Sequence, residues 1–331
     1  MKLPWEEVER EVLVKQDVGT DPKYGHKYDE RPVELLLQYG IVNVNKPAGP
    51  SSHQTSAYVQ EAIGISKAGH SGTLDPKVTG VLPVALGKGT RVVQALLPAG
   101  KEYVCLMHLH EAVDKKKVKQ ALRKSVGKIK QLPPVKSAVK RQWRERMIYY
   151  VEFMEMNKQD VLFRIGCQAG TYIRKYCTDF GKSLGVGAHM AQLIRTKAGP
   201  FTFDNMVTLQ DLKDAFFYWK EGDEKLIRHC VQPVEEGIGH LGKIWVTDTT
   251  VKSLTHGRDL AVPGVARVNT KIAKKDLVAV MSLKGELVAL GEASMDSETI
   301  IRSEKGICVR IKKVFMESDV YPRPPRDADE S

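Results

Sequence analysis

A change of pattern after residues 231–233, VQP, constrains the fold of this chain more than any other feature. Before it, candidate strands and helices follow one another in irregular order, which favours an α+β domain over a doubly wound parallel sheet. After it, residues 243–316 hold short alternating runs separated by Gly, Asp and Lys turns, the pattern of a small β-barrel. We expect an N-terminal arm at residues 1–35 and a larger domain at 36–240. A barrel at 243–318 and a disordered polar tail at 319–331 should follow.

The larger domain contains several segments with strand periodicity. Alternating apolar and polar side chains, rich in β-branched and aromatic residues, predict strands within 40–46, 81–86, 101–110, 146–156 and 160–170. The last two are separated by a short polar turn, so we expect them to pair as a hairpin.

Three further segments have helical character. Ser52 is expected to cap a helix over residues 53–63, and residues 115–126 form a helix with a heavily basic outer face. The clearest helix has Thr171 as its expected N-cap and ends at Gly185. Its apolar side chains recur at helical spacing, at Ile173, Tyr176, Cys177, Phe180 and Leu184.

Positive charge is concentrated in the larger domain. The chain carries a net charge of +11. Residues 114–146 hold thirteen Lys and Arg against two acids, whereas the segment from 243 to the end holds fifteen basic and thirteen acidic residues. A single basic run is often only a solvated helix face, but an imbalance of this size favours a polyanionic partner such as nucleic acid.

The cysteines and histidines do not form a recognisable metal or disulfide framework. Five cysteines are widely scattered without a CxxC pair, and nine histidines lack HExxH spacing. We therefore expect no metal and no disulfides. The N-terminus is charged throughout and no long apolar run is present, so we expect no signal peptide and no membrane span, which favours a cytoplasmic location.

Three clusters contain side chains that could carry chemistry. The glycine-rich stretch 69–91 holds a single acid, Asp75; Tyr103 begins a predicted strand; and Tyr172 and Arg174 lie at the start of the clearest helix. A helix N-terminus is electropositive and an arginine adds a fork of donors, so a carboxylate placed there would be held ionised. An ionised, partly desolvated aspartate is a competent nucleophile.

Each cluster also has a purely structural interpretation. An Asp before a Pro is most often a turn residue, a Tyr in a strand usually packs, and an Arg near a helix start usually bridges to a structural acid. Sequence spacing does not bring Asp75, Tyr103 and Arg174 together. The stretch GKGT at 87–90 lacks the spacing of a P-loop, so we exclude that alternative.

Several long motifs, in order, resemble a known family. GHSGTLDPKVTGVL is similar to the catalytic motif of the TruB branch of RNA pseudouridine synthases, and KPAGPSSHQ, AGTYIR and GVGAHMAQLIRTKAGPF resemble its other motifs. LPAGKEYVCLMHLH, LPPVKSAVKRQWRER and THGRDLAVPG are similar to the dyskerin family of box H/ACA ribonucleoproteins, of the archaeal type because no long Lys-rich tail follows. The resemblance runs from about Pro32 to Pro322 and implies a mixed, mainly antiparallel sheet followed by a PUA barrel with the N-terminal arm packed on it.

The resemblance implies roles for individual residues. Asp75 would be the essential aspartate, Arg174 its ion-pair partner and Tyr103 the tyrosine that stacks on the target base. Tyr172 would lie on the same active-site wall. The residues implied to contact RNA lie in five places along the chain. They are Lys46 in the first motif, His70 in the catalytic loop, Lys140, Arg141, Arg144 and Arg146 in a mobile thumb loop, Arg195 in a late motif, and Arg258 in the barrel. Ile194 departs from the family, which usually has Arg there, and puts one phosphate contact in doubt.

The implied reaction needs no cofactor. Uracil is detached from C1′ and rejoined through C5, and a base inside a duplex must first be flipped out. One carboxylate suffices, whereas a glycosidase normally needs two. Whether Asp75 attacks C1′, attacks the ring or assists a glycal route stays open.

Three functions remain open from the sequence. The first is a synthase for ribosomal RNA or tRNA, directed by an H/ACA guide RNA, with partner proteins of three kinds: a small zinc-binding subunit, a glycine-arginine-rich-type subunit and a kink-turn-binding subunit. The second is a stand-alone tRNA synthase of the TruB kind. The third is an RNA-binding scaffold without catalysis, against which the set Asp75, Tyr103 and Arg174 argues.

Overall fold

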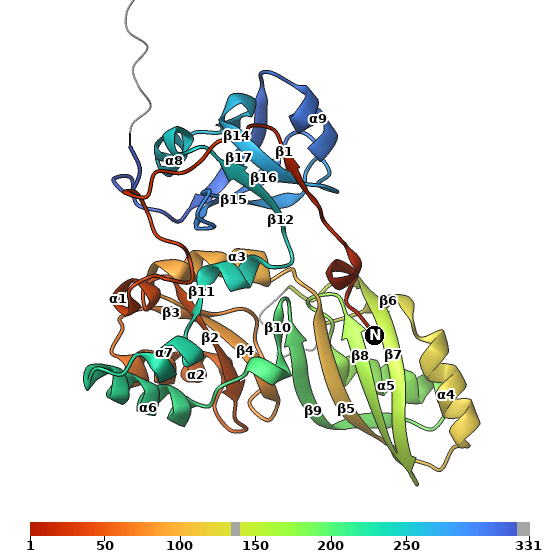
Figure 1. Cartoon of the computed structure of the whole chain (residues 1–331). Coiled ribbons are helices and arrows are strands. Elements are labelled where there is room, and N and C mark those ends of the chain that lie inside the picture. The colour runs from red at the N-terminus through yellow and green to blue at the C-terminus, as the bar shows by residue number, and fades with distance from the viewer. Residues whose placement is uncertain (134–139, 323–331) are drawn as a thin grey trace, which may run out of the picture.

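The computed structural model describes residues 1–133 and 140–322. A barrel sits above a wider α+β domain, and the N-terminal segment runs along both (Figure 1). The predicted fold class is thus confirmed. Lys136, counted in the basic run, and most of the predicted polar tail lie outside the described residues. In the described part of the chain, no helix combines the length and apolarity needed to cross a membrane.

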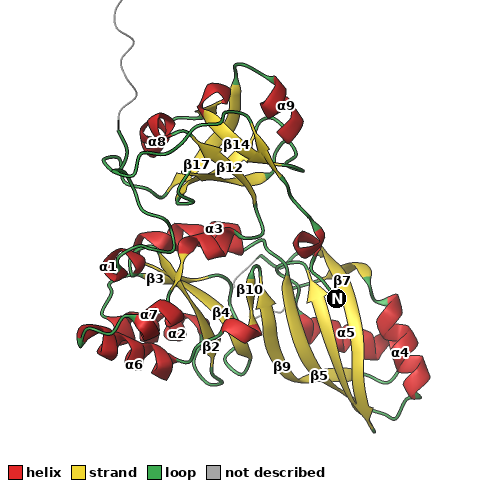
Figure 2. Ribbon diagram, in the orientation of Figure 1, coloured by secondary structure: helices red, strands yellow, loops and turns green. Residues whose placement is uncertain are grey.

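The wider domain is built on one long mixed sheet, drawn as yellow arrows in Figure 2. Its strands pair antiparallel except for β4 and β9, which run parallel at Thr79↔Ile194 and Gly80↔Arg195. Short strands β3 (Ala68–His70) and β10 (Phe201–Thr202) pair with β4 and β9. The order across the sheet is β11 (Gln232–Pro233), β2 (Gly40–Lys46), β4 (Thr79–Leu86), β9 (Ala188–Ala198), β5 (Lys101–Leu109), β8 (Asp160–Cys167), β7 (Arg144–Asn157) and β6 (Gly127–Gln131).

Helices cover the two halves of this sheet separately. Two of them pack on β5, β7 and β8 and bury the apolar side chains predicted from helical spacing, and three pack on β2 and β4. The first set is α4 (Lys115–Lys124) and α5 (Ile173–Leu184), and the second is α2 (Ser52–Ile63), α6 (Leu209–Lys220) and α7 (Lys225–Cys230). Shorter connecting helices are α1 (Val33–Leu36), η2 (Gly87–Val92), α3 (Val93–Leu96), η3 (Phe203–Asn205) and η4 (Val234–Ile238). The seam between the two halves is the parallel pair β4–β9.

Gly80 allows β4 and β9 to approach at this seam. Its φ is +98°, and a Cβ at this position would lie 2.2 Å from the carbonyl oxygen of Arg195. Any other residue would both strain the backbone and push the strands apart. The glycine of the VTGVL motif therefore fixes how closely the catalytic loop approaches β9.

Two predicted helix caps are wrong by one residue. The N-cap of α2 is Ser51, whose side chain accepts a hydrogen bond from the Gln54 amide, and not Ser52. The N-cap of α5 is Tyr172, and the Thr171 hydroxyl donates instead to the Gln168 carbonyl. Ser51 and Ser52 are equivalent candidates in sequence, whereas α5 begins after a residue whose side chain makes no cap hydrogen bond, so a search for capping side chains misplaces its start.

The barrel has its own core and includes a strand from the N-terminal arm. Strand β1 (Val12–Val14) pairs antiparallel with β14 (Val265–Asn269), so the arm completes one edge of the barrel sheet. The order continues through β12 (Gly242–Val246), β15 (Leu277–Met281), β16 (Leu287–Ala293), β17 (Ile307–Val314) and β13 (Leu260–Ala261). The remaining helical elements are η1 (Pro4–Glu7), α8 (Asp248–Thr255), η5 (Val262–Gly264) and α9 (Ser297–Arg302).

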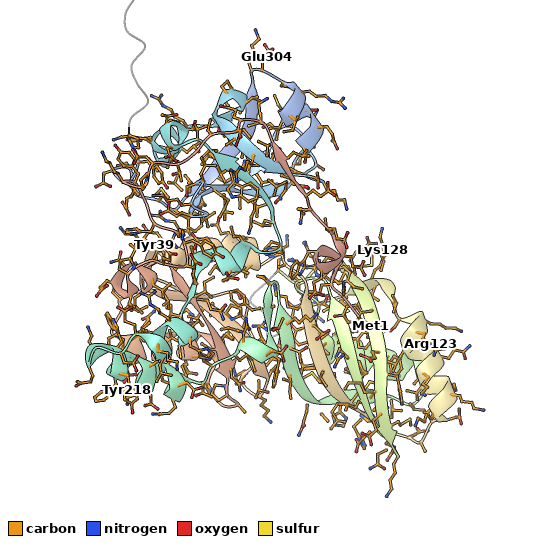
Figure 3. All side chains as sticks on the ribbon, in the orientation of Figure 1. Met1, Tyr39, Arg123, Lys128, Tyr218 and Glu304 are labelled. Carbon is orange, nitrogen blue, oxygen red and sulfur yellow. The ribbon has the colours of Figure 1, made fainter. Side chains whose placement is uncertain are left out.

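The barrel and the wider domain share an apolar cluster and a buried ion pair. Tyr39 lies at the junction (Figure 3), in a cluster that also contains Leu287 and Phe315 from the barrel side. Arg31 donates to both oxygens of Glu235, at 2.8 and 2.7 Å, and Glu235 also accepts from the Leu287 amide at 2.7 Å. These contacts fix the orientation of the barrel relative to the catalytic face.

Candidate active site

Asp75 lies in a loop that is held from below by two buried side chains. The Lys46 ammonium donates to the carbonyls of Pro47, Pro76 and Val78 at 2.8, 3.0 and 2.9 Å. On the other side of Asp75, the Ser52 hydroxyl accepts a hydrogen bond from the Leu74 amide at 2.8 Å. The loop is therefore anchored immediately before and immediately after its carboxylate.

The predicted pair of Asp75 and Arg174 meets in space. The Arg174 guanidinium donates to Oδ2 of Asp75, although the residues are 99 positions apart in sequence. Both side chains remain accessible, with exposed fractions of 51% for Asp75 and 57% for Arg174. Arg174 lies in the first turn of α5, where the unpaired amides of the helix add to the positive potential. An accessible carboxylate paired with a fixed guanidinium is placed as a nucleophile must be.

Tyr103 lies on β5 at the inner wall of the same site. Its side chain is only 9% exposed and belongs to the core cluster between the sheet and α5. Burial raises the pKa of the Tyr103 hydroxyl, and a hydrogen bond from Arg195 partly opposes that effect. The negative charge of Asp75 acts on the same group, which places the two side chains in one electrostatic environment. The structure thus brings all three predicted reactive residues together.

The prediction that Lys46 and Arg195 contact RNA is wrong, because both side chains are buried. Lys46 is fully buried, and all three of its N–H groups are directed at protein carbonyls. Arg195 is 1% exposed, and its Nε donates to the Val81 carbonyl at 2.6 Å. Neither cation is open to a phosphate, because the tertiary structure encloses both beneath the loop of Asp75.

Gln131 is a site residue that the sequence reasoning missed. Its amide oxygen accepts from the Tyr172 backbone N–H at 3.0 Å, and its amide nitrogen donates to the Tyr172 carbonyl at 3.1 Å. This two-point contact fixes the residue that precedes the first turn of α5. Gln131 is also paired with Arg144 across β6 and β7, so the strand end that carries Arg144 and Arg146 is tied to the start of α5, the helix that carries Arg174. A lone Gln at a strand end gives no signal of this role in sequence.

Lys101 is a second missed residue. It is 5% exposed, and its ammonium donates to the carbonyls of Leu96, Leu97 and Ala99 at 2.9, 3.0 and 2.7 Å. Burial, together with the charge of Arg195, lowers the pKa of Lys101 to about 7. Its position two residues before Tyr103, within LPAGKEYVCLMHLH, is the one sequence signal of this role.

The remaining predicted RNA contacts lie around the site and on the barrel. His70 is half-buried beside His53, and burial lowers its pKa, with the neighbouring charges of His53 and Arg195 acting in the same direction. Four basic residues follow the edge of the wider domain next to Gln131, with Lys140 and Arg141 exposed and Arg144 and Arg146 half-buried. Arg258 is exposed on the barrel, in the loop between α8 and β13.

A shallow groove of about 560 Å³ adjoins the anchored loop. Its lining includes Pro47, Thr79, Phe203 and the half-exposed Ile194, the residue that replaces the arginine usual in the resembled family. An arginine at this position would reach the groove, so the replacement removes a positive charge from its wall. A second groove of similar volume, lined by several lysines between α4 and α5, lies on the other half of the sheet, away from Asp75.

The arrangement can carry out one-carboxylate chemistry on a base that enters from solution. Asp75 is accessible, its partner Arg174 is fixed by α5, and Tyr103 supplies an aromatic wall. Within residues 1–133 and 140–322, no group of three or more His, Cys, Asp or Glu side chains is arranged to hold a metal ion.

Family models match the chain along almost its whole length. The TruB family pseudouridylate synthase N-terminal domain matches residues 60–173, and the tRNA pseudouridylate synthase B C-terminal domain matches 174–238. A PUA domain matches 242–315 and a DKCLD domain matches 1–56.

Relatives and solved structures cover the same extent. A probable tRNA pseudouridine synthase B of Methanopyrus kandleri is 52% identical over 97% of this chain and 95% of that protein, and one of Pyrococcus abyssi is 53% identical over 96% of each. A chain of a Cbf5-Nop10-Gar1 complex matches with a TM-score of 0.93 and 50% identity, covering 97% of this chain and 98% of its own. A chain of an H/ACA RNP bound to a substrate RNA containing 2′-deoxyuridine matches with a TM-score of 0.92 and 48% identity, covering 97% and 99%.

The fold, the site and these matches define a pseudouridine synthase catalytic domain joined to a PUA domain. The chain belongs to the TruB family of pseudouridylate synthases. Its likeness over the whole length to a Cbf5 protein confirms the dyskerin-type resemblance found in the sequence.

Proposed function

We propose that this chain isomerises uridine to pseudouridine in RNA as the catalytic subunit of a guide-directed H/ACA ribonucleoprotein. The observation that carries the proposal is the pairing of an accessible Asp75 with Arg174. The chain that holds this pair aligns with 99% of the length of a subunit from an H/ACA RNP with bound substrate RNA. In this proposal the chain binds partners of the Nop10 and Gar1 type, as the matched Cbf5 structure does. A kink-turn-binding subunit is a further proposed partner.

The proposed roles follow from the positions of the side chains. Asp75 acts as the nucleophile, Arg174 pairs with it and orients it, and the ring of Tyr103 stacks on the flipped uracil. A stacked base contributes roughly 1–3 kcal/mol, which offsets part of the few kcal/mol that base flipping costs. Tyr172 forms the wall between Arg174 and the strand end that carries Arg144 and Arg146.

The basic residues supply affinity without sequence preference. Lys140, Arg141, Arg144 and Arg146 are proposed to bind phosphates next to the target uridine, and Arg258 is proposed to contact RNA on the barrel. Phosphate contacts position the RNA but carry no base information. Selection of the uridine then comes from pairing with a guide.

A stand-alone tRNA synthase is the second candidate, because the full-length relatives carry the name tRNA pseudouridine synthase B. The two are separated by assaying pseudouridine in ribosomal RNA and in tRNA, with and without a guide RNA and the partner proteins. Product that depends on the guide supports the first function, and product on tRNA alone supports the second. No product under any condition, with intact RNA binding, contradicts both.

A further inference from the structure

Arg195 is a buried cation that has no carboxylate to pair with. It is 1% exposed and is the largest fully buried side chain among the described residues. Its neutral partners are the carbonyls of Val81, at 2.6 Å, and Gly72, at 3.3–3.4 Å, and the hydroxyl of Tyr103. No ion pair to it occurs among the described residues. Burying an unpaired guanidinium costs several kcal/mol, so a purely structural use of this side chain would be expensive.

The contacts of Arg195 place its charge beneath the reactive residues. Gly72 and Val81 lie on either side of Asp75 in sequence, so the guanidinium spans the base of the catalytic loop. Tyr103 is the direct register partner of Arg195 across the antiparallel strands β5 and β9. Directly opposed residues have neighbouring side chains on one face of the sheet. Arg195 thus lies at the hydroxyl end of the ring that forms the wall of the site.

Two other buried ammonium groups surround the same space. Lys46 is fully buried and Lys101 is 5% exposed, and the charge of Arg195 acts on both. Glu102, the chain neighbour of Lys101, contributes one buried negative charge against these three basic side chains, and it accepts hydrogen bonds from Tyr150 and Thr196. The interior behind Asp75 is therefore rich in positive charge.

The reaction supplies a negative charge at this place. When the C1′–N1 bond breaks, its electron pair stays on the uracil, where N1 and the ring oxygens share it. C5 then bonds to C1′, the C5 proton leaves and N1 gains a proton, so that the product is an isomer of the substrate. Fixed positive charge in a site with little water stabilises such an anion much more than the same charge would in water.

We propose that Arg195 is a positioning residue of this reaction: it fixes Tyr103 beside the flipped base and supplies the buried positive charge that stabilises the uracil as it detaches. The proposal rests on the proposed pseudouridine synthase function. It does not depend on whether C1′ is captured by Asp75 or loses a proton from C2′, since the uracil holds the electron pair in both routes.

The test compares two target nucleotides in the assembled complex under single-turnover conditions. Arg195→Met removes the charge at similar volume, and the rate constant on a uridine target should fall by about 10²–10³-fold, as for loss of one donor to a developing anion. RNA affinity should stay within about twofold, because Arg195 is buried away from phosphates. Arg195→Lys keeps the charge and should recover about tenfold or more of the lost rate.

A 5-fluorouridine target separates an electrostatic role from a structural one. Fluorine stabilises the uracil anion, so the rate at which this nucleotide is consumed depends less on the protein. The fold-loss in rate constant caused by Arg195→Met should therefore be smaller, by about tenfold or more, on 5-fluorouridine than on uridine. Ser52→Ala is the matched control: it loosens the Asp75 loop by loss of the Leu74 contact without changing charge, and its deficit should be the same on both targets.

If Arg195→Met lowers the rate constant by the same factor on uridine and on 5-fluorouridine, the inference is overturned. If that variant does not fold, Arg195→Gln, which retains a donor for the Val81 carbonyl, takes its place with the same expectations. An inactive wild-type complex would instead refute the proposed function itself.

Discussion

Replacing Lys46 by Met separates a loop-anchoring role from an RNA-contacting role. The substitution removes three charge-assisted hydrogen bonds, of 2.8, 3.0 and 2.9 Å, and leaves three carbonyls around the Asp75 loop without that donor. Unsatisfied buried groups cost about 1–3 kcal/mol each, but removing a buried ammonium relieves its own desolvation. Burial, together with the charge of Arg195, lowers the pKa of Lys46, in the direction that this offset requires. The expected net loss is about 2–4 kcal/mol of unfolding free energy.

Two measurements on the Lys46→Met protein decide between the roles. Urea denaturation reports the loss of stability, and RNA binding at several salt concentrations reports phosphate contacts. Each lost contact reduces the slope of log affinity against log salt by about 0.7–0.9. We expect Lys46→Met to leave this slope unchanged, while Lys140→Met, an exposed control, reduces it by about one contact without loss of stability. Unchanged stability together with a reduced slope for Lys46→Met would refute the anchoring role.

Three further predictions concern stability and stacking. Burial lowers the pKa of His240 to about 4, so the unfolded chain takes up a proton on this residue before the folded chain does. The free energy of unfolding should therefore fall by about 3 kcal/mol between pH 6.5 and pH 4 in wild type. Urea denaturation across this range should show no such contribution in His240→Gln. Arg31→Met leaves Glu235 buried without its partner, and a loss of about 3–5 kcal/mol is expected in the same assay; a loss under about 1 kcal/mol would contradict this. Tyr103→Leu keeps an apolar side chain but no aromatic face, so pseudouridine formation should fall by about tenfold or more with a small shift of the melting midpoint, whereas a collapse of that midpoint would favour a packing role.

Local patterns predicted the elements that position the site. Alternating side chains located β5, and helical spacing located the buried face of α5, because both elements contact the core along one face. The turn at Gly185 also ended α5 as predicted, with φ of +81°. These features depend on neighbours within a few residues, which a single sequence contains.

Burial of individual cations could not be predicted in the same way. Lysine and arginine are exposed in most proteins, and the family resemblance that implied RNA contacts for Lys46 and Arg195 gave no sign that both side chains are buried. Arg195 is enclosed by Val81 and Gly72, which lie 114 and 123 positions away in sequence. Such contacts are created by the pairing of β4 with β9, which local periodicity does not encode. The meeting of Asp75 with Arg174 was likewise supplied by family resemblance and not by spacing.

Pseudouridine formation by Asp75→Asn, measured in the fully assembled guide-RNA complex, reports directly whether Asp75 is the reactive group. The amide keeps the size of the side chain and accepts a hydrogen bond from Arg174, but it lacks the ionised oxygen that a nucleophile requires. We expect no detectable pseudouridine, with guide-RNA affinity within about twofold of wild type because the basic surfaces are unchanged. Retained turnover by the purified Asp75→Asn protein would contradict the assignment of Asp75 as the reactive group.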